Sequence, residues 1–126
     1  MAVYGVLADI HGNREALDTV LGLLQARAER LLCLGDVVGY NADPDECVER
    51  LRASRALCIA GNHDLIGLGR LDFRRCSTKA EYSLKRTRRA LGRDSSAWLG
   101  ALPPHLAPAD GVVLVHGGVR VVQQYM

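Results

Sequence analysis

The fold class of this 126-residue chain is decided by residues 3–13, which read VYGVLADIHGN. The run from Val3 to Ala8 is continuously apolar, a pattern typical of a short strand buried on both faces. A polar turn follows, and Asn13 is a good residue to begin a helix. Apolar residues then recur at helical spacing, at Leu17, Val20, Leu21 and Leu24. The stretch predicts a strand and a helix that packs on a sheet.

The same alternation repeats twice further along the chain. Residues 31–34 form a second apolar run that ends at Gly35-Asp36, and residues 56–60 form a third. Between them, Asp43-Pro44-Asp45-Glu46 has the N-cap residue, proline and first-turn acids of a helix start. One face of that helix carries Cys47, Val48 and Leu51. Short connections in this order imply parallel strands, so the predicted fold class is α/β.

The remainder of the chain predicts two more helices and one strand. A helical face recurs at Ala80, Leu84, Thr87 and Leu91, and a shorter helix is expected over Ser95–Leu102, ended by two prolines. Val112–Val115 is the last expected strand. With 48% hydrophobic and 24% charged residues, residues 1–126 have the composition of a single globular domain.

Composition and cysteine spacing exclude several classes of protein. The formal charge of +2 is too near balance to indicate nucleic-acid or membrane binding by the whole chain. No signal peptide or membrane-spanning run is present, so a cytoplasmic location without membrane contact is expected. The four cysteines form no CxxC pair, and Cys33 and Cys58 stand in apolar runs. Both are interpreted as reduced core residues.

Polar side chains with metal-ligand chemistry gather where the predicted strands end. Carboxyl ends of strands converge at one edge of an α/β sheet, which is where ligands bind. Carboxylates, imidazoles and an amide follow the four strands, at Asp9, His11, Asp36, Asn62, His63 and His116. Each alone has a plainer interpretation as a helix cap, a turn residue or a surface histidine. Because every strand end carries such a group, the set predicts a site for divalent cations. His105, expected in a loop, follows no strand and receives no role.

The motifs at these positions resemble those of the calcineurin-like metallophosphoesterases, in their branch of small bacterial phosphodiesterases. They read Asp9-Ile10-His11, Gly35-Asp36-Val37-Val38-Gly39-Tyr40, Gly61-Asn62-His63-Asp64 and Val115-His116-Gly117. The resemblance runs from Val3 to the C-terminus and implies an α/β sandwich of two sheets flanked by helices. It also implies a centre of two divalent metal ions, with manganese, iron or zinc bound.

The resemblance further implies a role for each site residue. Asp9 and His11 would hold the first metal, Asp36 would bridge both, and Asn62 with His116 would hold the second. His63 would be the general acid that protonates the leaving oxygen, and Asp64 would help to orient it. A shared carboxylate and a separate proton donor suit the in-line displacement that two metal ions support.

One departure from the family pattern carries an expectation of its own. The family has a further Gly-His-x-His motif after a later strand, which the chain lacks before Met126. The chain is therefore expected to be a truncated domain with each metal one protein ligand short, weak metal binding and low activity. Its uncovered sheet edge predicts self-association into a homo-oligomer.

These features predict a metal-dependent hydrolase that cleaves a phosphodiester or phosphomonoester. The alternative is a non-catalytic binding or scaffold protein with the same fold, against which the retention of His63 argues. Nine of the 16 basic residues lie between Arg70 and Arg93. They could form a lip that attracts phosphate-rich substrate or nucleic acid, but a solvated helix face is the favoured interpretation, since only Tyr82 could stack on a base.

Overall fold

The computed structural model of the chain describes residues 3–74, 76–109 and 111–116. Arg75 of the basic segment, Gly117 of the fourth motif and the residues after Gly117 lie outside the described residues. Within these ranges each of the first three strands is followed by a helix. Two further helices come next, and the last two strands form a hairpin. The alternation predicted from the sequence is confirmed.

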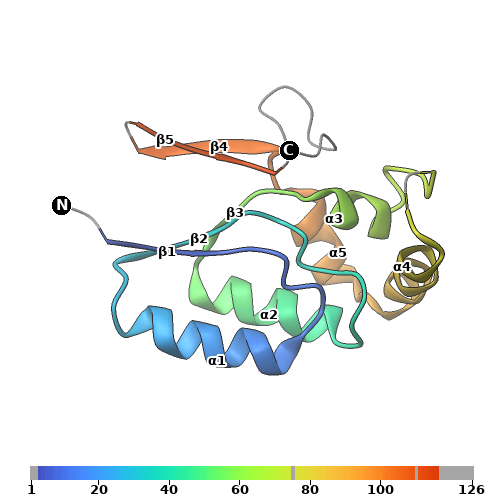
Figure 1. The fold of residues 1–126 in the computed structure, drawn as a ribbon, viewed down its shortest axis with the longest axis horizontal. Helices are drawn as coiled ribbons and strands as arrows, with labels where there is room; N and C mark the ends of the chain where they lie inside the picture. Colours follow the sequence, from blue (N-terminus) through green and yellow to red (C-terminus); the bar gives the residue numbers. More distant parts are fainter. Residues whose placement is uncertain (1–2, 75, 110, 117–126) are drawn as a thin grey trace.

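Three parallel strands form the central sheet. They are β1 (Tyr4–Leu7), β2 (Arg30–Cys33) and β3 (Leu57–Cys58), in the order β1-β2-β3. Helices α1 (Arg14–Gln25) and α2 (Pro44–Ser54) cover one face of this sheet (Figure 1). Leu31 packs toward these helices and Leu32 packs in a second cluster on the opposite side. Strand β2 is therefore buried on both faces, as its apolar run predicts.

The two helices begin where the sequence predicts, although their caps differ. The Asn13 side chain accepts a hydrogen bond from the Ala16 amide at 3.1 Å and so caps α1. Asp43 precedes Pro44 as expected, but its side chain makes no capping hydrogen bond, so proline at the first helical position marks this start. Both helices bury most of the predicted apolar residues against the sheet: Leu17, Leu21, Cys47, Val48 and Leu51. The expectation for Val20 is wrong, because Val20 is 37% exposed and lies outside the core.

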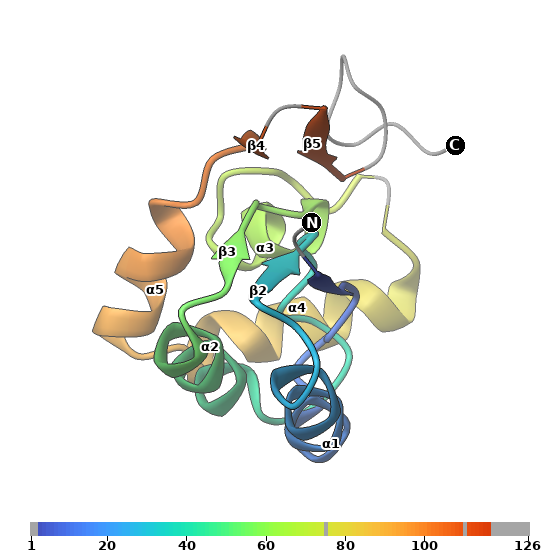
Figure 2. The same cartoon turned by 90° about the vertical axis from the view of Figure 1, so that its left-hand side faces the viewer.

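A hairpin of β4 (His105–Ala109) and β5 (Val112–Val115) lies over the other face of the sheet (Figure 2). Leu114, Leu106 and Val112 of the hairpin pack with Leu32 and Ile59 of the sheet layer. The expectation that His105 lies in a loop is wrong, because it is the first residue of β4. The prolines in and before this segment argue against a strand in the sequence. Pro108 is nevertheless tolerated, because it falls between Leu106 and Ala109, where the register is irregular and no regular hydrogen-bond ladder is interrupted.

The expectation that the strand at residues 3–8 is buried on both faces is also wrong. Strand β1 forms the outer strand of the parallel sheet, and Val3 and Val6 are 50% and 55% exposed. Tyr4 joins the cluster beneath the hairpin, whereas Val6 does not, since that cluster is centred on Leu32 and Ile59. The run from Val3 to Ala8 is therefore not buried on both faces. An apolar run shows only that a segment is hydrophobic. Whether its side chains are buried depends on the position of the strand in the sheet.

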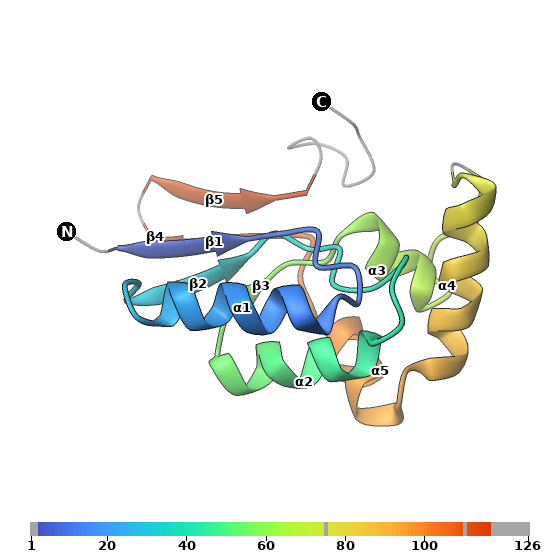
Figure 3. The same ribbon diagram turned by 60° about the horizontal axis from the view of Figure 1, so that its bottom comes forward.

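Three helices complete the layer arrangement (Figure 3). Helix α4 (Thr78–Ala90) buries Ala80, Leu84 and Thr87 as predicted, and α5 (Arg93–Gly100) occupies most of the expected second helix. The short α3 (Asn62–Gly67) was not expected, because six residues are too few for apolar periodicity. Its signal is Asp64, which stands at the third helical position and binds back to the Gly61 amide at 3.0 Å.

The cysteines confirm the interpretation of Cys33 and Cys58 as reduced core residues. Cys33, Cys47 and Cys58 are buried free thiols, and Cys76 is partly exposed. Burial raises the pKa of Cys47 to about 12. In the part of the chain that the structure describes, no helix has the length and apolar character to cross a membrane.

Candidate metal centre

Three site residues sit in loops whose backbone is held in an uncommon conformation. Asp9, His11 and Asp36 have φ angles of 55°, 49° and 56°, in the left-handed region. Each such residue costs about 1–3 kcal/mol unless its surroundings enforce the geometry. The loops enforce it together, because the amides of Asp9 and His11 donate to the carbonyls of Gly35 and Asp36, at 3.1 and 2.9 Å. The loops after β1 and β2 are thus joined into one rigid edge.

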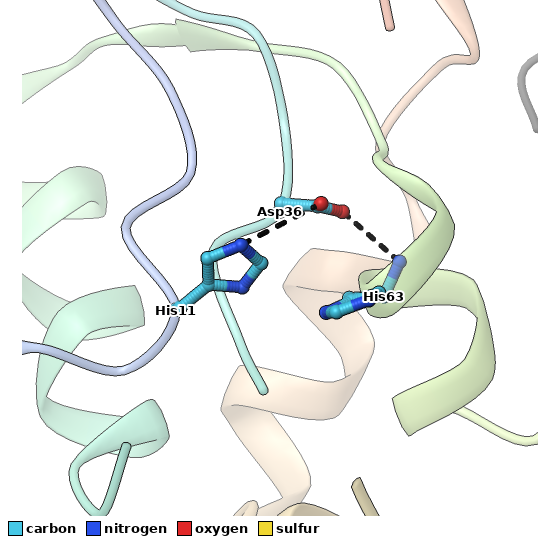
Figure 4. A group of neighbouring side chains, drawn as sticks. All are labelled: His11, Asp36 and His63. Carbon is cyan, nitrogen blue, oxygen red and sulfur yellow. Dashed lines mark hydrogen bonds and ion pairs between the residues drawn. The ribbon is translucent and has the colours of Figure 1, made fainter. Parts of the chain in front are cut away.

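Asp36 lies at the centre of the candidate site. Its Oδ2 atom lies 3.8 Å from His11 Nε2 and 3.3 Å from His116 Nε2, and its Oδ1 accepts the His63 amide at 3.0 Å. Figure 4 shows its carboxylate between His11 and His63. Asp36 is only 5% exposed, and burial alone would raise the pKa of its carboxyl group. The hydrogen bond and charge of His116 and the charge of His63 outweigh burial and lower that pKa.

Asp64 holds the loop that carries Asp36. Its side chain is fully buried, and its two oxygens accept four backbone amide hydrogens, those of Asp36, Val37, Val38 and Gly61, at 2.8–3.1 Å. Desolvation raises the pKa of Asp64 to about 7, against the opposing effect of its amide donors. The Nδ1 atom of His63 has no hydrogen-bond partner among the described residues, Asp64 included. The Asp64 carboxylate shapes the loop at Asp36, and its role in orienting His63 stays a prediction.

Two histidines present Nε2 to the site in the same way. His11 Nδ1 lies 3.0 Å from the Val38 carbonyl oxygen, and His116 Nδ1 lies 2.7 Å from that of Leu34. A proton on Nδ1 bonded to a backbone carbonyl leaves Nε2 as the coordinating atom, which is the usual arrangement of metal-binding histidines. Both Nε2 atoms face oxygens of Asp9, Asp36 or Asn62. The hydrogen bond to Asp36 raises the pKa of His116 to about 9.

His63 is packed among aromatic rings. Its ring centroid lies 4.9 Å from that of His11 and 5.2 Å from that of Tyr40. Its Nδ1 atom is buried and has no hydrogen-bond partner among the described residues. A Cβ atom at Gly39 would lie 2.9 Å from this nitrogen, so the glycine lets the imidazole approach the loop. Burial lowers the pKa of His63.

The ligand atoms fall into two groups that share Asp36. One consists of His11, Asp36 and His63, the other of Asp9, Asp36 and His116, and the ligand atoms within each lie within 4.8 Å of one another. Asn62 stands beside the second group, with its Oδ1 atom 3.0 Å from His116 Nε2. The six predicted residues are thus brought together. Imidazole nitrogens pre-oriented by carbonyls, together with carboxylate oxygens, are chemistry that fits zinc, iron or manganese.

Three features of the site are not predicted from the sequence. They are the ring contacts of Tyr40, the close approach at Gly39 and the hydrogen bonds by which Asp64 holds its loop. Gly39 and Tyr40 belong to the motif Gly35-Asp36-Val37-Val38-Gly39-Tyr40, and this membership is the one sign of their role in the sequence.

The basic segment is partly structural. Arg88 donates two hydrogen bonds to the Ile66 carbonyl, at 3.0 and 2.8 Å, and lies over the Phe73 ring. Arg70 donates to the Gly100 carbonyl at 2.8 Å. Arg86 donates to the Tyr40 carbonyl at 3.1 Å. These bonds favour a structural role for part of the segment.

Comparison with known proteins identifies the family to which the chain is similar. Residues 3–125 match the calcineurin-like phosphoesterase family. An uncharacterised protein of Methanocaldococcus jannaschii is 35% identical over 103 residues, which are 81% of this chain and 42% of that protein. The chain thus spans less than half the length of this curated relative.

Solved structures agree with the fold. A metallophosphoesterase from Sphaerobacter thermophilus has 31% identity and a TM-score of 0.82, covering 99% of this chain and 51% of that one. A hypothetical protein from Pyrococcus horikoshii OT3 shares the fold, with a TM-score of 0.80 at 24% identity, covering 99% and 58%. The family match over residues 3–125, nearly the whole chain, establishes that this protein belongs to the calcineurin-like phosphoesterase family.

Proposed function

We propose that this protein is a phosphoesterase that hydrolyses a phosphodiester or phosphomonoester at a centre of two divalent metal ions. The observation that carries the proposal is the position of Asp36, whose carboxylate belongs to both ligand groups. A carboxylate shared in this way is what a pair of neighbouring cations requires. Manganese, iron and zinc all suit the donor set.

The ligand sets that the family resemblance implies differ from these two groups in the placement of Asp9 and His63. Asp9, His11 and Asp36 would hold the first ion, and Asp36, Asn62 and His116 the second. Asp9, which lies in the group of His116, would thus bind with His11, and His63, which lies in the group of His11, would stay free to move a proton. Bound there, the ions would supply Lewis-acid polarisation of the phosphoryl oxygens and activation of water for in-line attack. The Nδ1 bonds of His11 and His116 to backbone carbonyls keep their Nε2 atoms aimed at the site before any ion arrives.

His63 is the proposed proton donor to the leaving oxygen. Its ring lies beside that of His11, at the same edge of the site as the Asp36 carboxylate. Burial lowers the pKa of His63, while the charges of Asp36 and Asp9 act to raise it. The negative charge of a bound phosphate ester would act in the same direction as these carboxylates. A proton donor in this position contributes about 10²–10⁴ in rate.

Asp64 is proposed to act as a positioning residue. By accepting the amides of Asp36, Val37 and Val38, it sets the direction in which the Asp36 carboxylate points. Preorganised ligands bind metal more tightly because less conformational entropy is lost on binding.

A hydrolysis assay with bis(4-nitrophenyl) phosphate and 4-nitrophenyl phosphate, each with added Mn²⁺, Zn²⁺ or Fe²⁺, tests the proposal. Metal-dependent turnover that Asp36→Asn abolishes is the expected result. Asp94→Asn is the matched control, because Asp94 lies in the first turn of α5, outside both ligand groups. No turnover of either ester with any of the three metals would favour the alternative of a non-catalytic binding or scaffold protein.

A further inference from the structure

Tyr40 is a half-exposed aromatic residue built into the edge of the candidate metal centre. It is 40% exposed, and its ring centroid lies 5.0 Å from that of His11, nearly perpendicular to it. On its other side the ring of His63 lies 5.2 Å away at 47°. None of the proposed metal ligands or proton-transfer steps uses Tyr40.

The backbone of Tyr40 is held in place at some cost. Its φ angle of 63° lies in the left-handed region, which is uncommon for a bulky residue. Helix α4 secures it from both sides: the Tyr40 amide donates to the buried Ser83 Oγ at 2.9 Å, and the Tyr40 carbonyl accepts from Arg86 at 3.1 Å. Contacts from residues more than 40 positions away thus fix a conformation that the residue itself disfavours. Such strain is typical of functional positions.

We propose that Tyr40 determines specificity by forming the side wall of the leaving-group subsite, and that the substrates are phosphate esters with a planar aromatic leaving group. The placement of the leaving group rests on the proposed function. A proton donor must lie within hydrogen-bond reach of the leaving oxygen, so the group attached to that oxygen lies alongside His63. The Tyr40 ring lies 5.2 Å from that of His63, and the residue is 40% exposed, so its ring can contact a group bound beside His63.

The aromatic ring of Tyr40 favours a planar leaving group over an aliphatic one. Aromatic rings attract one another in offset or edge-to-face geometry beyond the area that they bury. The Tyr40 ring packs against His11 and His63, and its exposed part is available for such a contact. An aliphatic leaving group would gain less from the same wall.

Binding of two non-hydrolysable phosphonates to the Mn²⁺-loaded protein tests this proposal. Benzylphosphonate carries a planar group one atom from phosphorus, and ethylphosphonate carries a methyl group at the same place. Isothermal titration gives the two dissociation constants for the parent and for four variants: Tyr40→Phe, Tyr40→Asn, Tyr40→Gly and Tyr82→Asn. Asparagine and glycine both accept a left-handed backbone, so they remove the ring with the least strain. Tyr82 is the matched control, since it is a 68% exposed tyrosine of α4.

We expect the parent to prefer benzylphosphonate, and Tyr40→Asn and Tyr40→Gly to lose about tenfold of that preference, the size of an aromatic stacking contact. Tyr40→Phe and Tyr82→Asn should keep the parent's ratio. Equal binding of both phosphonates by the parent, no binding of either, or an unchanged ratio in both ring-less variants would overturn the proposal. Hydrolysis of phenyl phosphate and of bis(4-nitrophenyl) phosphate by the parent is measured in parallel: the absence of both activities would overturn the proposed function, while the phosphonate ratio still decides the role of Tyr40.

Discussion

The buried carboxylate of Asp64 accepts the backbone amide of Asp36 at 3.0 Å, although the two residues stand 28 positions apart in the chain. The same side chain accepts the amides of Val37, Val38 and Gly61. One acid at the start of α3 therefore joins the loops after β2 and β3. This contact gives the loop its shape, and so places the carboxylate that both ligand groups share.

We expect Asp64→Asn to destabilise the protein. An asparagine side chain has one acceptor oxygen and presents an NH₂ group to some of the four amide donors, which leaves buried donors without partners. The free energy of unfolding should fall by about 3 kcal/mol. Urea denaturation measures it, with Asp94→Asn as the control for loss of an exposed acid. A change as small as that of the control would show that the four bonds contribute little.

Asp36→Asn should be the most damaging single substitution for metal binding, because it weakens a ligand that both ions share. Elemental analysis after dialysis against Mn²⁺ should find loss from both positions, whereas Asp9→Asn should weaken one position only. If Asp36→Asn binds two ions per chain as tightly as the parent, the bridging role is wrong.

His63→Ala should separate rate from metal content. If His63 is the proton donor, the variant keeps its metal and loses about 10²–10⁴ in kcat. Turnover of 4-nitrophenyl esters and metal analysis of the same sample measure both quantities. A variant that instead loses metal would move His63 into the ligand shell, alongside His11 and Asp36.

Gly39→Ala should destabilise the protein in two ways: an alanine is strained at the positive φ angle of this position, and its Cβ atom would crowd the imidazole of His63. Gly39 has a φ angle of +97°, and an added Cβ would lie 2.9 Å from His63 Nδ1. Gly69→Ala is a matched control, because φ there is +80° and a Cβ would meet no atom of the described chain within 4 Å. We expect Gly69→Ala to cost about 1–2 kcal/mol of unfolding free energy. Gly39→Ala should cost about 1–3 kcal/mol more, from the added crowding. Thermal and urea unfolding compare the pair, and equal losses would contradict the contact with His63.

Thiol reactivity should distinguish Cys76 from the three core cysteines. The thiolate is the reactive form, and burial raises the pKa of Cys47 to about 12, while a hydrogen bond with Cys33 and burial raise that of Cys58. Burial also raises the pKa of Cys76, but Cys76 is partly exposed and the other three thiols are buried. At pH 8 a thiol-specific reagent should therefore label Cys76 first and rapidly compared with the other three, which should react only after unfolding. Cys76→Ser is the control and should abolish the rapid phase. Rapid labelling of more than one thiol in the folded protein would show that the core opens.

Local patterns in the sequence predicted much of the fold. Apolar spacing placed α1, α2 and α4, because the face that a helix buries recurs every three or four residues. The order of strands and helices predicted a parallel sheet, and its convergent strand ends predicted which polar residues meet. Asp9, His11, Asp36, Asn62, His63 and His116 are brought together as that reasoning required.

Tertiary structure alone decided the features that depend on distant partners. The exposure of Val6 follows from the place of β1 at the edge of its sheet, and β4 exists only as the partner of β5. The tautomer of His116 is set by a carbonyl 82 residues away, and Asp64 finds its amide donors up to 28 residues back along the chain. No local pattern reports such bonds, because a side chain pairs with whichever group folding brings within about 3 Å, and sequence spacing carries no information on that distance.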